Sequence, residues 1–435
     1  MSQQDLTPND GEGNETGDSL ENTATTADAI MAGPSTSHRR GRRSIFEEAC
    51  EMLAISILTY GIAEFRKLVR DGKITRRSCE KSGLPMKLSD AAHNLSLHLE
   101  DVKREIEPAT FDLYMTGANL VVERLLNLRI EEEEETMLMV FDDERSEREL
   151  VFSIMANPKD RRITVSFRGS VTIRDLLIDS KVSLVQIPNP VEPGTTVGIH
   201  CGFRDYMYGK TARYGQALRG GERRKIDSIC DQLFDVVDQY PQYRIFITGH
   251  SLGGALATLL AFELGAKRDD RIRETISCVS FASPRVGNLA FANAFQSLER
   301  TKRIRCLCVA NEKDIFPEIP RTGTKNPCGI ICFGDRIYRH VGVSFSLLRD
   351  GGYNISFPEH YQHPVRLFFR DWFNSAQNKG QSLGRLICRE NLTENHSCMQ
   401  YWARLNLNQS ALQKVHLDEV YGRLVQRRGS ALTGK

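Results

Sequence analysis

One serine of this chain lies in a setting suited to covalent chemistry. It is Ser251, the third residue of a Gly-His-Ser-Leu-Gly-Gly hexapeptide that covers residues 249–254. Residues 244–248 before it are rich in β-branched and aromatic side chains, which predicts a buried strand. Residues 255–264 after it are almost all helix formers, which predicts a helix. A serine on such a strand-to-helix turn exposes its hydroxyl above the sheet and can act as a nucleophile.

A nucleophilic serine needs a base, and the base needs a carboxylate that orients it. In one known arrangement the acid and then the histidine follow the serine along the chain. Residues 304–310 predict a strand, and Asp314 follows it closely. Asp314 is therefore a candidate for the acid. A role in a turn or a helix cap is equally open, because aspartate is common in both.

Three histidines after Asp314 are candidates for the base. His360 and His363 lie three residues apart, whereas His340 belongs to a stretch that reads better as part of a strand. A single histidine is more often structural than catalytic. The residues alone therefore leave both His360 and His363 open.

Five further motifs stand in order around the hexapeptide. They are Phe-Arg-Gly-Ser at 167–170, His-Cys-Gly-Phe at 200–203, Ser-Phe-Ala-Ser-Pro-Arg-Val-Gly-Asn at 280–288, the segment 311–317, and Arg-His-Val-Gly at 339–342. Together these motifs resemble those of the class 3 lipases, the family of the fungal triacylglycerol lipases and of the diacylglycerol lipases. Asp175 and Asp179 follow the first motif at a spacing similar to the family's, and Ala282 stands where the family usually has glycine.

The resemblance covers about residues 105–375 and implies an α/β-hydrolase fold. This fold has a mostly parallel central sheet with helices on both faces, and the family adds a helical lid. The sequence is consistent with this architecture, since it predicts strands near 150–156, 162–167, 244–248, 276–282 and 304–310.

The resemblance also assigns roles to the candidate residues. Asp314 takes the place of the family's acid. The family's histidine usually follows Asp or a small residue and has an aromatic residue a few positions later. This pattern favours His360 over His363, because Pro364 directly after His363 suits the start of a helix. Ser170 and Leu252 take the place of the oxyanion-hole residues, whose backbone N–H groups stabilise the tetrahedral intermediate.

The expected activity is that of a serine-dependent lipase. Ser251 would attack a carboxylic ester of tri- or diacylglycerol, His360 would accept its proton and Asp314 would fix the imidazole tautomer. An acyl-enzyme would form and be hydrolysed, with no metal or organic cofactor. A phospholipase or galactolipase of the same family is the first alternative, because one triad serves all these esters. A catalytically silent, lipase-like binding protein is the second.

A short amphipathic helix is expected after the Phe-Arg-Gly-Ser motif. Within residues 172–182, Ile173, Leu176 and Leu177 recur at helical spacing, opposite Arg174 and the two aspartates named above. Such a helix beside an oxyanion loop could cover a lipid-binding cleft as a lid and open at a lipid surface. The alternative is an ordinary surface helix whose apolar side packs into the core.

Composition divides the chain into four segments. Residues 1–43 are polar and poor in large apolar side chains, which predicts a disordered N-terminal tail. Residues 44–104 are expected to form a helical extension, and the apolar helix predicted within it is expected to pack on the lipase domain. Residues 105–375 are the expected lipase domain, and residues 376–435 a polar, partly helical C-terminal tail.

The sequence also limits the setting in which the protein acts. It shows no signal peptide and no transmembrane segment, and it contains 11 cysteines, an odd number. These features predict a cytoplasmic protein, with peripheral association at membranes or lipid droplets as a further possibility. The expected partner is lipid substrate at such a surface. The formal net charge of +2 gives no reason to expect nucleic acid, and the oligomeric state is not predicted.

Overall fold

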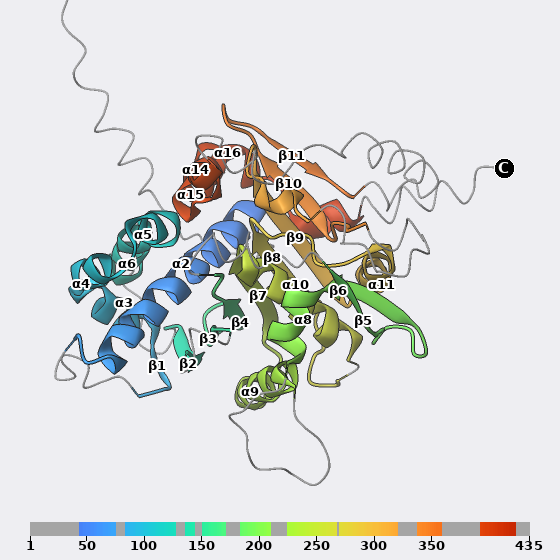
Figure 1. Ribbon diagram of the computed structural model, residues 1–435, viewed down its shortest axis with the longest axis horizontal. Coiled ribbons are helices and arrows are strands. Elements are labelled where there is room, and N and C mark those ends of the chain that lie inside the picture. Colours follow the sequence, from blue (N-terminus) through green and yellow to red (C-terminus); the bar gives the residue numbers. More distant parts are fainter. Residues whose placement is uncertain are drawn as a thin grey trace, which may run out of the picture. The chain divides into compact units, whose positions relative to one another are not determined.

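A nine-stranded sheet forms the centre of the fold in the computed structural model (Figure 1). The structure describes residues 43–74, 83–127, 135–143, 150–170, 183–209, 224–267, 269–320, 337–358 and 392–422. In spatial order the strands of the sheet are β1 (Met86–Lys87), β2 (Met137–Asp142), β3 (Phe152–Asn157), β4 (Arg162–Phe167), β7 (Arg244–His250), β8 (Ile276–Phe281), β9 (Ile304–Asn311), β10 (Val343–Leu347) and β11 (Tyr353–Ser356).

Five consecutive strands, β4, β7, β8, β9 and β10, run parallel in the middle of the sheet. The strands at both edges are antiparallel to their neighbours. The parallel strands place their carboxyl ends along one edge of the sheet, where ligands bind in open α/β folds. A parallel sheet with helices on both faces and a serine turn between β7 and α10 (Leu252–Ala266) confirms the predicted α/β-hydrolase fold.

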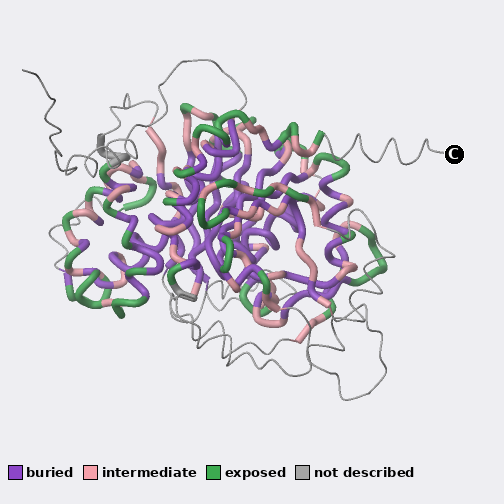
Figure 2. Tube along the Cα trace, turned by 90° about the horizontal axis from the view of Figure 1, so that it is seen from above, coloured by how far each residue is buried: buried purple, intermediate pink, exposed green. Residues whose placement is uncertain are grey.

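Successive side chains of the central strands serve two different cores, one on each face of the sheet. In β7, Phe246 joins the first core, whereas Ile245 and Ile247 join the second. This alternation follows from the two-residue period of a strand. Figure 2 shows that the buried segments gather inside the molecule and the exposed ones around them.

Helices pack on each face of this sheet. The first core receives α2 (Ile45–Arg70), α3 (Leu88–Leu97), α4 (Leu99–Glu105), α5 (Pro108–Tyr114), α6 (Ala118–Asn127), α15 (Cys398–Leu407) and α16 (Gln409–Leu412). The second receives α8 (Cys201–Tyr208), α9 (Lys225–Gln239), α10 and α11 (Leu289–Arg300). A separate hairpin of β5 (Leu184–Pro188) and β6 (Thr196–His200) precedes α8, so the proline-rich segment between them is a hairpin loop.

The N-terminal helix α2 is a core helix. It begins with a capping box, in which the Ser44 hydroxyl accepts from the backbone N–H of Glu47 and the Glu47 carboxylate accepts from that of Ser44. Buried residues account for 19 of its 26 positions, far more than the single apolar stripe of a surface helix. The predicted helix that packs on the hydrolase domain is therefore confirmed. No described helix is long and apolar enough to cross a membrane.

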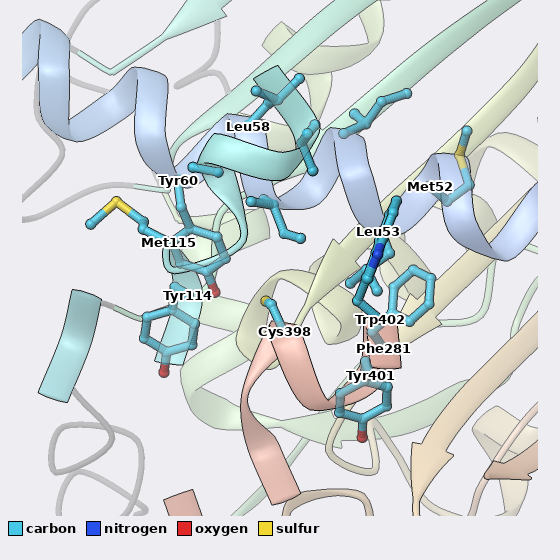
Figure 3. Packing of buried hydrophobic residues seen from close by; sticks show 14 of the residues in the cluster. Met52, Leu53, Leu58, Tyr60, Tyr114, Met115, Phe281, Cys398, Tyr401 and Trp402 are labelled. Carbon is cyan, nitrogen blue, oxygen red and sulfur yellow. The ribbon is translucent and has the colours of Figure 1, made fainter. Parts of the chain in front are cut away.

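The C-terminal segment packs against the same helix. The backbone N–H of Ile45 donates to the carbonyl of Val415 (2.8 Å), and Leu412 and Leu417 are buried beside α2. Figure 3 shows Trp402 of α15 close to Leu53 of α2. The first and last described segments thus complete the first core together.

The predicted lid at residues 172–182, with Asp175 and Asp179, lies outside the described residues. So do residues 1–42 of the predicted disordered tail.

Candidate active site

Ser251 occupies the turn between β7, which ends at His250, and α10, which begins at Leu252. Its backbone angles are φ 57° and ψ −126°, a region that costs a non-glycine residue on the order of 1–3 kcal/mol. The side chain is buried, and its Oγ has no hydrogen-bond partner among the described residues. The strained turn thus holds this hydroxyl buried and unpaired, whereas the sequence predicted a hydroxyl exposed above the sheet.

Two glycines of the hexapeptide make the turn possible through close approach. A Cβ at Gly253 would overlap the carbonyl oxygen of Phe167, and a Cβ at Gly249 would overlap the backbone of Gly253. Any side chain at these positions would therefore push α10 away from β4 and β7.

Asp314 follows β9 by three residues at the carboxyl edge of the sheet. Its side chain is fully buried. Its Oδ1 accepts from the backbone N–H of Phe316 (3.0 Å), and its Oδ2 accepts from the Tyr401 hydroxyl (2.7 Å). The hydrogen bond from Phe316 is the turn role that the sequence left open for Asp314. The same carboxylate also faces the candidate active site.

The histidine that contacts Asp314 is His396, the last residue of α14 (Leu392–His396). Its Nδ1 lies 3.0 Å from Oδ2 and 3.2 Å from Oδ1 of the aspartate. Because a carboxylate accepts, Nδ1 is the donor and Nε2 keeps a lone pair. This Nε2 is buried and has no partner among the residues that the structure places.

Neighbouring groups fix the ring and the backbone of His396. The ring of Phe316 lies against it, with centroids 3.8 Å apart. On the other side, Nε2 of His250 donates to the carbonyl oxygen of His396 (2.9 Å). Burial lowers the pKa of His250 well below its usual value, so this imidazole is neutral. The residue directly before Ser251 thus holds the backbone of the histidine that pairs with Asp314.

The two histidines that the sequence put forward, His360 and His363, lie outside the described residues. His396 matches part of the pattern expected of the family's histidine, with Asn395 in place of the usual Asp or small residue. Asn395 precedes it, Tyr401 follows five residues later, and α15 begins at Cys398. Sequence reasoning missed His396 because it lies in the segment assigned to the C-terminal tail, 82 residues after Asp314.

The predicted oxyanion-hole residues occupy two adjacent turns. Ser170 comes three residues after the end of β4, and Leu252 is the first residue of α10. The N–H of a first helical residue has no acceptor within its own helix. A Cβ built on Gly169 would lie 3.4 Å from Cβ of Ser251, so the segment before Ser170 passes next to the candidate nucleophile.

Other motif residues have structural roles. His200 caps α8, where its Nδ1 accepts from the backbone N–H of Gly202 (3.1 Å). Burial lowers the pKa of His200 to about 4. Asn288 caps α11 and also accepts from the backbone N–H of Gly198 (3.1 Å), which ties β6 to that helix. The described ranges contain no group of three His, Cys, Asp or Glu side chains placed to hold a metal ion.

Comparison with known proteins agrees with these motifs. The family model described as "Lipase (class 3)" matches residues 164–324, a range that contains Ser251 and Asp314 but neither α2 nor His396. The chain is similar to a lipase of Rhizomucor miehei, with 33% identity over 161 residues, or 37% of this chain and 38% of the relative. The solved structure of that lipase with its propeptide gives a TM-score of 0.42 at 20% identity, over 73% of this chain and 74% of the other.

Two further relatives have more specific names. A secreted mono- and diacylglycerol lipase of Malassezia restricta is 30% identical over 40% of this chain and 52% of its own length. A phospholipase A1-II of Oryza sativa is 30% identical over 38% of this chain and 40% of its own length. The matched part thus spans about two fifths to one half of these curated relatives. Residues 164–324 of this chain are therefore similar to the class 3 lipase family.

Proposed function

We propose that the protein is a serine hydrolase that cleaves carboxylic esters of acylglycerols, with Ser251, His396 and Asp314 as its triad. The observation that carries the proposal is the buried His396–Asp314 pair beside the strained serine turn. Two groups that a triad would join, Oγ of Ser251 and Nε2 of His396, are both buried and unpaired among the described residues. A buried polar group without a partner is costly, so an arrangement with two of them favours a functional role.

The proposed mechanism assigns one role to each group. Oγ of Ser251 attacks the ester carbonyl while Nε2 of His396 takes its proton, and Asp314 stabilises the resulting imidazolium through Nδ1. The backbone N–H groups of Leu252 and Ser170 bind the oxyanion of the tetrahedral intermediate. Loss of one such donor costs about 3 kcal/mol of transition-state stabilisation. His396 then protonates the leaving alcohol, and water releases the fatty acid from the acyl-enzyme.

The proposed substrates are acylglycerols, with diacylglycerol as the first candidate. Support comes from the names of the relatives, which include a lipase and a mono- and diacylglycerol lipase. The phospholipase A1 among them supports phospholipids as the second candidate. In this proposal the protein meets its lipid at a membrane or droplet surface in the cytoplasm.

Turnover of the two lipid classes tests this proposal. Fatty-acid release is measured from dioleoylglycerol emulsions and from phosphatidylcholine vesicles, with wild type and Ser251→Ala, and both proteins are treated with a fluorophosphonate probe. We expect release from diacylglycerol by wild type, and loss of both release and labelling in Ser251→Ala. Faster release from phosphatidylcholine would replace the substrate assignment. A folded wild type that neither labels nor turns over either lipid would contradict the hydrolase proposal and favour the lipase-like binding protein.

A further inference from the structure

Helix α2 reaches the candidate active site although it lies outside the part of the chain that matches the family model. Two of its side chains, Tyr60 and Glu64, are separated by one helical turn and therefore lie on the same face. Both contact the Phe-Arg-Gly-Ser segment at residues 167–170. Ser170, a proposed oxyanion donor, directly follows the contacted residues.

The hydroxyl of Tyr60 bridges the two turns that form the proposed oxyanion hole. It accepts a hydrogen bond from the backbone N–H of Gly169 (2.9 Å) and donates to the carbonyl oxygen of His250 (3.4 Å). Gly169 directly precedes Ser170, and His250 lies two residues before Leu252. Burial raises the pKa of Tyr60 well above its usual value, so the hydroxyl keeps its proton and serves as donor and acceptor at once.

The ring of Tyr60 is itself held in place. It stacks on the ring of Tyr114 in α5, with centroids 4.5 Å apart and planes 7° from parallel. Figure 3 shows these two side chains beside each other, next to Cys398 of α15. A ring packed between fixed elements leaves its hydroxyl little freedom, so the bridge has a defined position.

Glu64 makes the second contact, with the residue before Gly169. Its Oε1 lies 2.8 Å from Nη1 of Arg168, and the two side chains are only 9% and 5% exposed. A buried ion pair of this kind is a strong geometric constraint, because removing one partner leaves an uncompensated charge. Consecutive residues of the segment, Arg168 and Gly169, are thus both held by α2.

We infer that Tyr60 and Glu64 are positioning residues that set the backbone N–H of Ser170 relative to that of Leu252. The inference rests on the proposed function, in which these two N–H groups bind the oxyanion. An oxyanion hole works only when its donors lie about 2.7–3.1 Å from the oxygen. A small displacement of one turn therefore weakens binding of the transition state more than binding of the substrate. The residues touch no substrate and act only through the turns that they hold.

The same helix and the neighbouring helix offer matched controls. Glu48 of α2 makes an equally buried ion pair, with Arg305 of β9 (2.7 Å), but that arginine lies outside the proposed oxyanion turns. Tyr114 is as buried as Tyr60 and stacks on it. Glu48→Gln and Tyr114→Phe therefore make the same chemical changes as Glu64→Gln and Tyr60→Phe without removing a contact to residues 168–170.

The test measures kcat and KM on p-nitrophenyl butyrate and the inhibition constant of an alkylboronic acid, whose tetrahedral adduct mimics the intermediate. We expect Tyr60→Phe and Glu64→Gln to lower kcat about 10-fold or more, to weaken the boronic acid by a similar factor and to leave KM within about twofold. Tyr114→Phe and Glu48→Gln should keep the wild-type kcat and boronic acid affinity at a temperature where all variants are folded.

Two outcomes separate the inference from the proposed function. If wild type turns over the ester while Tyr60→Phe and Glu64→Gln, both folded, keep its kcat and boronic acid affinity, the positioning role is wrong and the proposed function stands. The role is also wrong if the two controls lose as much kcat as the test variants, because a general loss of packing then accounts for the effect. A folded wild type without turnover or fluorophosphonate labelling would overturn the proposed function, and this inference with it.

Discussion

The Tyr401 hydroxyl donates a 2.7 Å hydrogen bond to Oδ2 of Asp314 and accepts one from the backbone N–H of Asn311 (3.0 Å). One side chain of α15 therefore ties the proposed catalytic acid to the end of β9. The same helix follows directly after His396, so the acid and its histidine are supported by one C-terminal segment.

Tyr401→Phe should damage both stability and catalysis. The change leaves the buried N–H of Asn311 unpaired and frees one oxygen of Asp314, which should lower the free energy of unfolding by about 1–3 kcal/mol. It should also lower kcat severalfold, because the carboxylate is less firmly oriented. Urea unfolding and ester hydrolysis measure the two effects.

Tyr421→Phe is the control for that variant. The Tyr421 hydroxyl accepts from the backbone N–H of Cys306 (2.8 Å), also on β9 but away from Asp314. The Tyr421→Phe protein should be less stable than wild type and should keep the wild-type kcat. Equal kcat values for the Tyr401 and Tyr421 variants would show that Tyr401 does not orient the acid.

The serine turn should not tolerate a methyl group at Gly253. A Cβ there meets the carbonyl of Phe167, a backbone atom that cannot move without displacing β4. Gly253→Ala should therefore lower the free energy of unfolding by about 1–3 kcal/mol or more and slow fluorophosphonate labelling. Gly83→Ala, where a Cβ meets nothing within 4 Å, is the control and should change neither quantity. A Gly253→Ala protein as stable and reactive as this control would refute the close approach.

Stability should fall as the pH falls below about 6.5. His200 has a pKa of about 4 in the folded protein because it is buried, below the ordinary histidine value of about 6.5. The folded state therefore binds fewer protons than the unfolded state between these values. The contribution of His200 to stability is fully present above about pH 6.5. It is lost toward pH 4, by up to about 1.4 kcal/mol per pH unit. Burial also lowers the pKa of His250, so this histidine contributes to the pH dependence with the same sign.

His200→Asn should reduce this pH dependence. Asparagine can still cap α8 with its side-chain oxygen, but it does not titrate. Urea unfolding at pH 7 and pH 5 should show a smaller difference for His200→Asn than for wild type, whereas the exposed His93→Asn should match wild type. An unchanged difference in His200→Asn would mean that His200 is not the titrating group.

The C-terminal helix α15 should behave as part of the core. Leu405→Ala, at a fully buried position, should lower the free energy of unfolding by about 2–5 kcal/mol. Leu407→Ala, two residues later and 63% exposed, should stay within about 0.5 kcal/mol of wild type. Equal effects of the two substitutions would argue against the packing of α15 in the first core.

Local patterns were sufficient to predict much of the fold. The apolar and β-branched content of β3, β4, β7, β8 and β9 predicted these strands, and glycine spacing predicted the serine turn. Helix α2 was also predicted, because its apolar composition is evident over a single window.

The contacts that complete the site join residues far apart in the sequence, so local patterns do not reveal them. His250 and His396 are separated by 146 residues, and Tyr60 and Gly169 by 109. Residues 376–435 are predicted from the sequence to be a polar, partly helical tail, and in the structure buried residues such as Tyr401 and Leu405 help to complete the first core. The assignment of His396 as the histidine that pairs with Asp314 therefore depends on that tertiary packing.

The most direct test is the rate of fluorophosphonate labelling in His396→Ala beside His360→Ala and His363→Ala, all shown to be folded. If His396 is the base, its loss should slow labelling of Ser251 by about 1,000-fold or more, because the serine hydroxyl is no longer activated. The other two variants should label within about threefold of wild type. Labelling at the wild-type rate in His396→Ala, with loss in His360→Ala or His363→Ala, would contradict the proposed triad and return the base to the segment that the sequence first indicated.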